Sequence, residues 1–332
     1  MRLEDRIYGC LAGLAVGDAM GMPTEMLTPE QIRSEFGWVD RPVRAPTWHP
    51  HKDFAAGQVT DDTGQALAVV HAMREDGTLT AATVATELLK WAEAAGETLP
   101  AILGPSTRKA LERLKAGEDP RQSGREGTTN GAAYRAIPVG LVNFDRPDRL
   151  LQQVVEACLP THGTSLAISG AAAVAWAVAE ALTETASLES ILAAAKHGAE
   201  EGRRSGAWAW GTLLEKRIDL AVRLVAENPE PVAALAAIYD FVGVGMEIAE
   251  SVAAAFGVIC LAKGDPMLAV TYAANIGGDT DTIAALSGAV CGAWRGIDAI
   301  DRQILAHVEK VNQLDLYSEA GSLVHKMEKR IA

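Results

Sequence analysis

Two short acidic blocks, TDDT at residues 60–63 and GGDTDT at residues 277–282, hold the residue types best suited to chemistry. Each block precedes an apolar stretch with a helical pattern, beginning at Gln65 and at Ile283. An ordinary helix cap needs only one side-chain oxygen. Two carboxylates with flanking hydroxyls exceed that need, and hard oxygen donors suit Mg²⁺, Mn²⁺ or Ca²⁺ rather than zinc. We therefore expect the two blocks to meet as halves of one divalent-metal site.

The electrostatics of such a meeting favour bound cations. If the blocks converge, their four carboxylates repel one another, so at least one keeps its proton unless cations lie among them. A pair of divalent cations resolves this conflict. Two alternatives stay open from the residues alone. Each block can be a separate helix cap, and Asp279-x-Asp281 can be the DxD motif of a nucleotide-sugar transferase.

Composition predicts an all-α protein with no general affinity for polyanions. The 332 residues are 48% hydrophobic but only 5% aromatic, and alanine, the best helix former, supplies much of the difference. A net charge of −13 argues against binding to nucleic acid or to an anionic membrane. The four cysteines are widely spaced, without a metal or disulfide pattern. We expect reduced thiols, no membrane span and a cytoplasmic location.

The elements that position the blocks are predicted to be helices. The first, from Asp5 to Met20, carries glycine at every fourth position (Gly9, Gly13 and Gly17), a spacing that indicates a second helix packed very close. A loop-rich segment follows over residues 23–59, and its length is typical of a functional loop. Amphipathic patterns predict further helices, one of them over residues 206–226. No linker interrupts the chain, so we expect a single domain over residues 1–332.

Three other segments carry polar residues at predicted helix ends. GDAMGMPTE at 17–25 brings Glu25 into a loop, and Asp18 in the same segment opposes the helix dipole and is expected to have a donor partner. NGAAYR at 130–135 and THGT at 161–164 each precede an apolar helix. The chain has no GxSxG, P-loop or dinucleotide-binding motif, so acyl transfer by a serine elbow, P-loop chemistry and hydride transfer lack support.

Taken in order, these five segments resemble the ADP-ribosylglycohydrolase family, which includes the dinitrogenase reductase-activating glycohydrolase and the ADP-ribosyl-acceptor hydrolases. The TDDT and GGDTDT pair is the most specific part of the resemblance. The resemblance implies a compact, all-α orthogonal helical bundle with a binuclear Mg²⁺ or Mn²⁺ centre, which agrees with the expectation from composition.

Position by position, the resemblance assigns roles to particular residues. Glu25 matches an acidic residue implicated in catalysis, and we expect it to handle protons while Asp62 and Asp281 orient water or bridge the metals. The loop at Asn130 and Gly131 lines the substrate cleft in the family, and His162 matches a residue near the ribose or diphosphate. Tyr134 stands where the family commonly has methionine, and residues 124–129 also differ. The matching metal ligands are Thr60, Asp61, Asp62, Asp279, Asp281 and Thr282.

The expected activity is hydrolysis of a ribosyl glycosidic bond with two divalent cations. An ADP-ribosylated protein or an ADP-ribose-like small molecule is the substrate that the resemblance implies, and a smaller nucleoside-like N-glycoside is the alternative within the same class. Two readings from other classes also remain open. One is a DxD-type transferase, and the other is a non-catalytic, crystallin-like relative. The second is disfavoured because every proposed metal ligand in this chain retains a hard oxygen donor.

Overall fold

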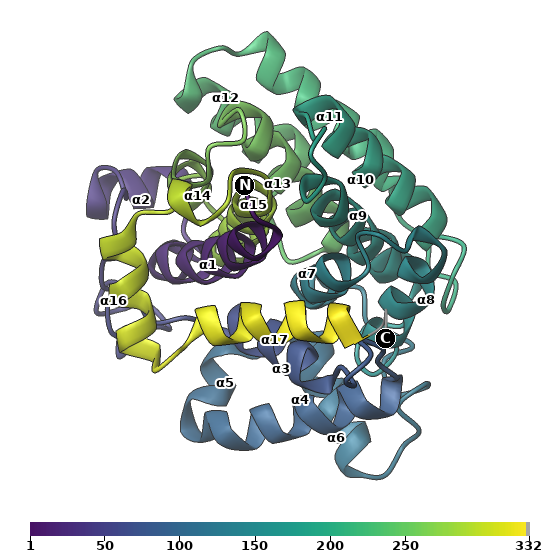
Figure 1. Cartoon of the computed structure of the whole chain (residues 1–332). Coiled ribbons are helices and arrows are strands. Elements are labelled where there is room, and N and C mark those ends of the chain that lie inside the picture. The colour runs from purple at the N-terminus through teal and green to yellow at the C-terminus, as the bar shows by residue number, and fades with distance from the viewer. Residues whose placement is uncertain (330–332) are drawn as a thin grey trace. The chain divides into compact units, whose positions relative to one another are not determined.

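The computed structural model describes residues 1–329 and is built from helices (Figure 1). Over these residues the only β-type pairings are the isolated bridges Thr129–Glu247 and Thr164–Ala207, so the all-α prediction is confirmed. None of the described helices is both long and apolar enough to cross a membrane.

The chain divides into two compact units, each made of segments far apart in the sequence. Unit 1 comprises Met1–Thr63, Lys216–Met246 and Glu250–Tyr317. Unit 2 comprises Gly64–Glu215, Glu247–Ala249 and the chain from Ser318 onwards. The single-domain organisation expected from the sequence stays a prediction.

The helices fall into three groups along these segments. Unit 1 contains α1 (Leu3–Gly21), α2 (Pro29–Phe36), α12 (Pro231–Ala237), α14 (Pro266–Ala274), α15 (Thr280–Arg295) and α16 (Arg302–Asn312). Unit 2 contains α4 (Ala81–Ala95), α5 (Leu99–Ile102), α6 (Pro105–Lys115), α7 (Gly131–Val142), α8 (Pro147–Cys158), α9 (Ser165–Ala181) and α10 (Leu188–Gly202). The helices with residues in both units are α3 (Asp61–Ala72), α11 (Leu214–Glu227), α13 (Ile248–Leu261) and α17 (Leu316–Lys329).

Helix α1 packs against α15 through its glycines (Figure 1). A Cβ built on Gly13 would lie 2.1 Å from the carbonyl oxygen of Gly288, and one on Gly17 would lie 2.2 Å from that of Ala284. Gly9 meets α15 near its end, whereas Gly21 meets Thr280 at its start, so the helices are antiparallel. The glycine spacing therefore predicts the packing correctly. It also brings the end of α1 beside the start of α15, where GGDTDT lies.

Two local predictions need correction. The helix expected over residues 206–226 begins only at Leu214, because residues 206–213 form no helix and the backbone of Ala207 bonds instead to Gly163 and Ser165. The loop-rich segment 23–59 contains α2, which begins with a capping box in which Thr28 and Gln31 bond each other's backbone. This Thr-Pro-x-Gln signal was present in the sequence, but it is short and lies among prolines.

Candidate metal centre

Three buried carboxylates from two distant segments meet in unit 1. Glu25, Asp279 and Asp281 each place a carboxylate oxygen within 4.8 Å of the other two. Glu25 follows α1, whereas the two aspartates come from the turn into α15. The antiparallel contact of these helices brings the segments together, although more than 250 positions separate them in the sequence.

The first acidic block joins the same cluster. The hydroxyl of Thr60 lies 3.4 Å from Asp281 Oδ2 and donates to it, while the backbone N–H of Asp62 lies 3.4 Å from the Thr60 hydroxyl. Asp62 is buried, and its Oδ2 atom has no hydrogen-bond partner among the described residues. The backbone N–H of Thr282 donates to Asp281 Oδ1 at 2.9 Å. The two acidic blocks thus meet, as their sequence predicts.

Asp18 holds the first acidic block in place through hydrogen bonds. This fully buried carboxylate on α1 accepts the backbone N–H groups of Thr60 at 2.9 Å and Thr63 at 3.0 Å, and the Thr63 hydroxyl at 2.6 Å. Burial raises the pKa of Asp18 to about 6, although the bonds from Thr63 and Thr60 oppose the rise. The donor partner expected for Asp18 is therefore the start of α3. Its three bonds are structural, and they set the position of Asp61 and Asp62.

Two histidines hold Glu25 in place. His51 Nε2 lies 2.5 Å from Glu25 Oε2, and His49 Nε2 lies 2.6 Å from the backbone oxygen of Glu25. The backbone N–H of His51 donates to His49 Nδ1, so the proton of a neutral His49 is on Nε2, where it bonds Glu25. Both rings are about 1% exposed. Sequence reasoning treated these histidines only as part of a long loop, because HxH has no fixed spacing to Glu25.

The loop of Glu25 is also tied to the second block. The Thr24 hydroxyl lies 3.0 Å from the Thr280 hydroxyl and 2.8 Å from the backbone oxygen of Ala274. Met26 donates to the carbonyl of Gly278 at 2.7 Å, and Gly278 donates to that of Leu27 at 2.9 Å. Gly278 has φ of 73°, and a Cβ there would lie 2.4 Å from a backbone oxygen, so only glycine fits this turn. None of these contacts uses a carboxylate.

Burial and mutual repulsion set the protonation of the cluster. Burial first, and then the charges of Asp18, Asp61 and Asp279, raise the pKa of Asp62 well above its ordinary value. Burial likewise raises the pKa of Asp281, and the negative charges of Glu25 and Asp279 raise it further. Carboxylates in such surroundings take up either protons or cations.

The donor set fits hard divalent cations. Carboxylate and hydroxyl oxygens are what Mg²⁺ and Mn²⁺ prefer, and the residues described around the cluster offer no cysteine ligand. The buried Oδ2 atom of Asp62 is a second, independent indication of a cation site. A buried polar atom without a hydrogen-bond partner lowers the stability of the fold by about 1–3 kcal/mol unless a ligand binds it. The cluster can therefore hold a cation, and the roles of its individual residues stay predictions.

The residues predicted to bind substrate lie in unit 2. Asn130 is buried at the start of α7, directly before Gly131. A Cβ on Gly131 would lie 2.7 Å from Cε1 of His162, so the structure brings these two predicted segments together. His162 is fully buried, and burial followed by the charge of Arg135 lowers its pKa well below the ordinary value. The ring is therefore neutral.

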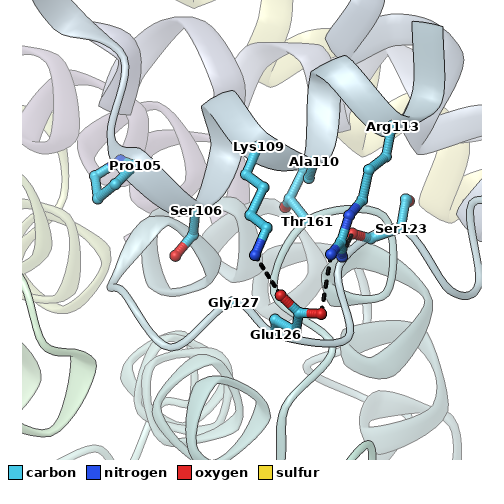
Figure 2. A pocket seen from close by; sticks show the side chains of 9 residues that line it. All are labelled: Pro105, Ser106, Lys109, Ala110, Arg113, Ser123, Glu126, Gly127 and Thr161. Atoms are coloured by element: carbon cyan, nitrogen blue, oxygen red, sulfur yellow. Dashed lines mark hydrogen bonds and ion pairs between the residues drawn. The ribbon is translucent and has the colours of Figure 1, made fainter. Parts of the chain in front are cut away.

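An ion-paired pocket anchors the loop that leads to Asn130. Figure 2 shows Glu126 between Lys109 and Arg113, which stand one turn apart on α6. Glu126 bonds Lys109 and, at 2.9 Å, Arg113, and these two cations lower its pKa to about 2. The pocket is about 210 Å³ and is also lined by Thr161. Glu126 ties both Lys109 and Arg113 to the loop that it belongs to, so we interpret this pocket as an anchor for that loop.

The chain is similar to known proteins along its whole length. The sequence profile described as ADP-ribosylglycohydrolase matches residues 1–332. The chain is 34% identical over 334 residues to the uncharacterized protein YegU of Escherichia coli (strain K12), covering 99% of each. It is 26% identical to human ADP-ribosylhydrolase ARH3, covering 96% of this chain and 93% of the relative.

The solved structures give the same result for the fold. The structure of an ADP-ribosylglycohydrolase-related protein complex superimposes with a TM-score of 0.71 and 28% identity, covering 99% of each chain. The helical fold, the two acidic blocks that meet in it and a profile match over the whole sequence lead to one conclusion. The chain belongs to the ADP-ribosylglycohydrolase family and is a hydrolase of glycosidic bonds.

Proposed function

We propose that this protein hydrolyses the ribosyl glycosidic bond of an ADP-ribosylated protein or an ADP-ribose derivative, using two divalent cations, Mg²⁺ or Mn²⁺. The observation that carries the proposal is the buried cluster of Glu25, Asp279 and Asp281, with the partnerless oxygen of Asp62 beside it. The relative ARH3, whose name describes an ADP-ribosylhydrolase, supports the choice of substrate class. The residues proposed to hold the cations are Thr60, Asp61, Asp62, Asp279, Asp281 and Thr282.

Hydrolysis of a glycosidic bond requires a positioned water, a proton for the leaving group and an anionic environment for an oxocarbenium-like transition state. Bound cations would supply positive charge that orients sugar hydroxyls and lowers the pKa of water. The carboxylates themselves supply the negative surroundings that favour the transition state. Asp62 is the residue we assign to water orientation, because its Oδ2 atom is buried and has no protein hydrogen-bond partner.

Glu25 is the residue we assign to proton transfer. His51 bonds Oε2, which leaves Oε1 to accept a proton from the attacking water and to pass one to the departing oxygen or nitrogen. His51 Nε2 lies 2.5 Å from Oε2, and an N–H group there donates to the Glu25 carboxylate.

The test is a panel of substrates with Mg²⁺ or Mn²⁺. It includes ADP-ribosyl-arginine, ADP-ribosyl-serine, O-acetyl-ADP-ribose and ordinary nucleosides, with release of ADP-ribose or base measured by chromatography. We expect cation-dependent release from at least one ADP-ribosyl substrate and loss of that release in Asp62→Asn. Turnover of nucleosides alone would favour the smaller N-glycoside. Turnover only with an added acceptor would favour a transferase, and inactivity on every substrate would reject the proposal.

A further inference from the structure

A small pocket with aromatic and charged walls lies beside the second acidic block in unit 1. It has a volume of about 120 Å³ and is formed by α2 with the segment after it, α12 with the turn after it, and the end of α14. Pockets that bind whole small molecules usually measure roughly 300–1,000 Å³. The space therefore fits one amino-acid side chain and is too small for a nucleotide. Its charged and aromatic lining residues are Glu30, Arg33, Trp38, Tyr239 and Asp240.

Protein contacts hold the walls of this pocket in place. The Asn275 side chain accepts the backbone N–H of Val39 at 2.9 Å and donates to the Val39 carbonyl oxygen at 2.8 Å. Trp38 directly precedes this anchored residue. On the opposite wall, a Cβ built on Gly277 would lie 3.1 Å from the ring of Tyr239. The pocket thus has its shape before any ligand binds.

The charges of the lining favour a cation. Glu30 and Asp240 contribute two carboxylates, against one guanidinium from Arg33. Hydrogen bonds from its own backbone and from Thr28 lower the pKa of Glu30, so this carboxylate is ionised at neutral pH. The faces of tryptophan and tyrosine rings also attract cations. An acidic lining with two aromatic rings is therefore typical of a site for an arginine or lysine side chain.

The wall that carries Tyr239 and Asp240 has an unusual backbone. A single π-helical turn over Ile238–Val242 follows α12 directly. Such turns are rare and occur frequently at functional sites. Trp38 and Val232 line the same pocket with 41% and 52% of their surface exposed. Large apolar side chains that gather around a pocket, rather than lying scattered, indicate contact with another molecule.

The pocket is close to the carboxylate cluster. Ile276 lines the pocket, and Asp279 of the cluster is three residues further along the chain. Three residues of polypeptide span at most roughly 11 Å. An extended polypeptide that holds one residue at the cluster can therefore place a side chain about two to four positions away in the pocket.

We propose that this pocket binds an arginine or lysine side chain of the polypeptide that carries the ADP-ribosyl group, a few positions from the modified residue. This assignment rests on the proposed function, because the glycosidic bond that is cleaved must lie at the cluster. It narrows the substrate class to a basic segment of a modified protein, in preference to a free ADP-ribose derivative. The net charge of −13 also favours encounter with a basic segment.

The first experiment measures binding of a cationic side chain without any hydrolysis. Nα-acetyl-argininamide is titrated into the protein while the indole N–H signals of the tryptophans are followed by NMR, and the Trp38 signal is identified by its loss in Trp38→Phe. We expect this signal to shift in a saturable way, with a dissociation constant of about 1–10 mM.

Two variants with opposite effects serve as matched controls for the charge of the lining. Asp240→Asn removes a carboxylate and should weaken binding about twofold to fivefold, whereas Arg33→Gln removes the opposing cation and should strengthen it by a similar factor. Both side chains are exposed, so neither change should affect folding. A Trp38 signal that does not shift, an equal response to Nα-acetyl-leucinamide, or effects of the same sign in the two variants would overturn the proposal.

The second experiment connects the pocket with hydrolysis. Peptides carry one ADP-ribosyl group, in the linkage that the substrate panel identifies, and have either arginine or glutamate two, three or four positions away. We expect arginine at one of these positions to raise kcat/KM about threefold to tenfold, mainly through a lower KM. The ratio between the two peptides should fall to about one in Trp38→Ala and keep its wild-type value in Asp298→Asn, an exposed carboxylate outside the pocket.

The outcomes separate this proposal from the proposed function. Hydrolysis of the peptides without a preference for arginine would overturn the role of the pocket and leave the proposed function intact, as would turnover of small ADP-ribose derivatives alone. If Nα-acetyl-argininamide binds at Trp38 while no substrate of the panel is hydrolysed, the proposed function fails and the pocket stands as a site for a cationic side chain.

Discussion

Removal of the cations should leave a proton in the carboxylate cluster of unit 1, and cation binding should release it. The carboxylate oxygens of Glu25, Asp279 and Asp281 lie within 4.8 Å of one another. At an effective dielectric constant of about 20, each ionised pair at that distance repels by about 3.5 kcal/mol. Neutralising one member removes two of the three repulsions, which is about 7 kcal/mol.

The competing cost is that of holding a proton at neutral pH. From the ordinary aspartate pKa of 3.8, keeping a proton at pH 7 costs about 4.4 kcal/mol. The repulsion removed by one proton, about 7 kcal/mol, exceeds the cost of about 4.4 kcal/mol for holding that proton at pH 7. Burial further disfavours the ionised carboxylates, so the metal-free cluster holds at least one proton. In Asp281→Asn two of the three repulsions, about 7 kcal/mol, are absent from the start, so the metal-free cluster has a weaker drive to hold a proton.

Calorimetry in several buffers measures this release. Mn²⁺ is titrated at pH 7 in PIPES, HEPES and Tris, whose protonation enthalpies differ, and the slope of apparent enthalpy against buffer enthalpy gives the protons released. We expect about one or more for the wild type, about one fewer with weaker binding for Asp281→Asn, and the wild-type value for Asp298→Asn, an exposed carboxylate used as control. A wild-type slope of zero would refute the electrostatic reasoning.

Three further predictions concern the scaffold and the loop. Gly13→Ala should lower the free energy of unfolding, measured by urea denaturation, by at least about 3 kcal/mol, because its Cβ would clash with the backbone of α15. Gly321→Ala in α17 is the control: a Cβ there has nothing within 4 Å, so this change should be neutral or slightly stabilising. His51→Ala should lower kcat at least about tenfold, because it frees the Glu25 carboxylate that His51 holds in place; an unchanged kcat would contradict this. Burial raises the pKa of Asp18 from 3.8 to about 6, so the free energy of unfolding of the metal-free protein should fall as pH rises from about 4 to 6. The loss from this group is roughly 3 kcal/mol. An equally steep loss of stability in Asp18→Asn would contradict the assignment to Asp18.

Much of the fold could be predicted because its signals are local. Glycine at every fourth position of α1 has no use in an isolated helix, so it indicated the close partner that α15 provides. The acidic blocks likewise exceed what helix capping needs. Residues 206–213 were misjudged because Ala207 bonds to the backbone of Gly163 and Ser165 in place of a helix, and partners more than 40 residues away leave no periodic pattern.

The histidines around Glu25 and the arginine behind His162 show where sequence reasoning ends. His49 and His51 bond Glu25 from 24 and 26 positions further along the chain, and no spacing rule predicts that the intervening segment folds back in this way. Arg135 lay inside a recognised segment, yet a charged residue on an apolar helix reads as solvent-exposed until its burial is known.

The contacts that bring the segments of the cluster together largely avoid the proposed metal ligands, which has a consequence for the chemistry. Thr24 bonds Thr280, Met26 and Gly278 bond through their backbones, and Asp18 holds the start of α3. These bonds and the α1–α15 packing offset the repulsion of the carboxylates when no cation is present. Cation binding then relieves the repulsion between the carboxylates, and this relief increases the affinity of the site for the cation. A scaffold of this kind keeps its fold when one ligand is changed, so loss of a single carboxylate should weaken cation binding before it unfolds the protein.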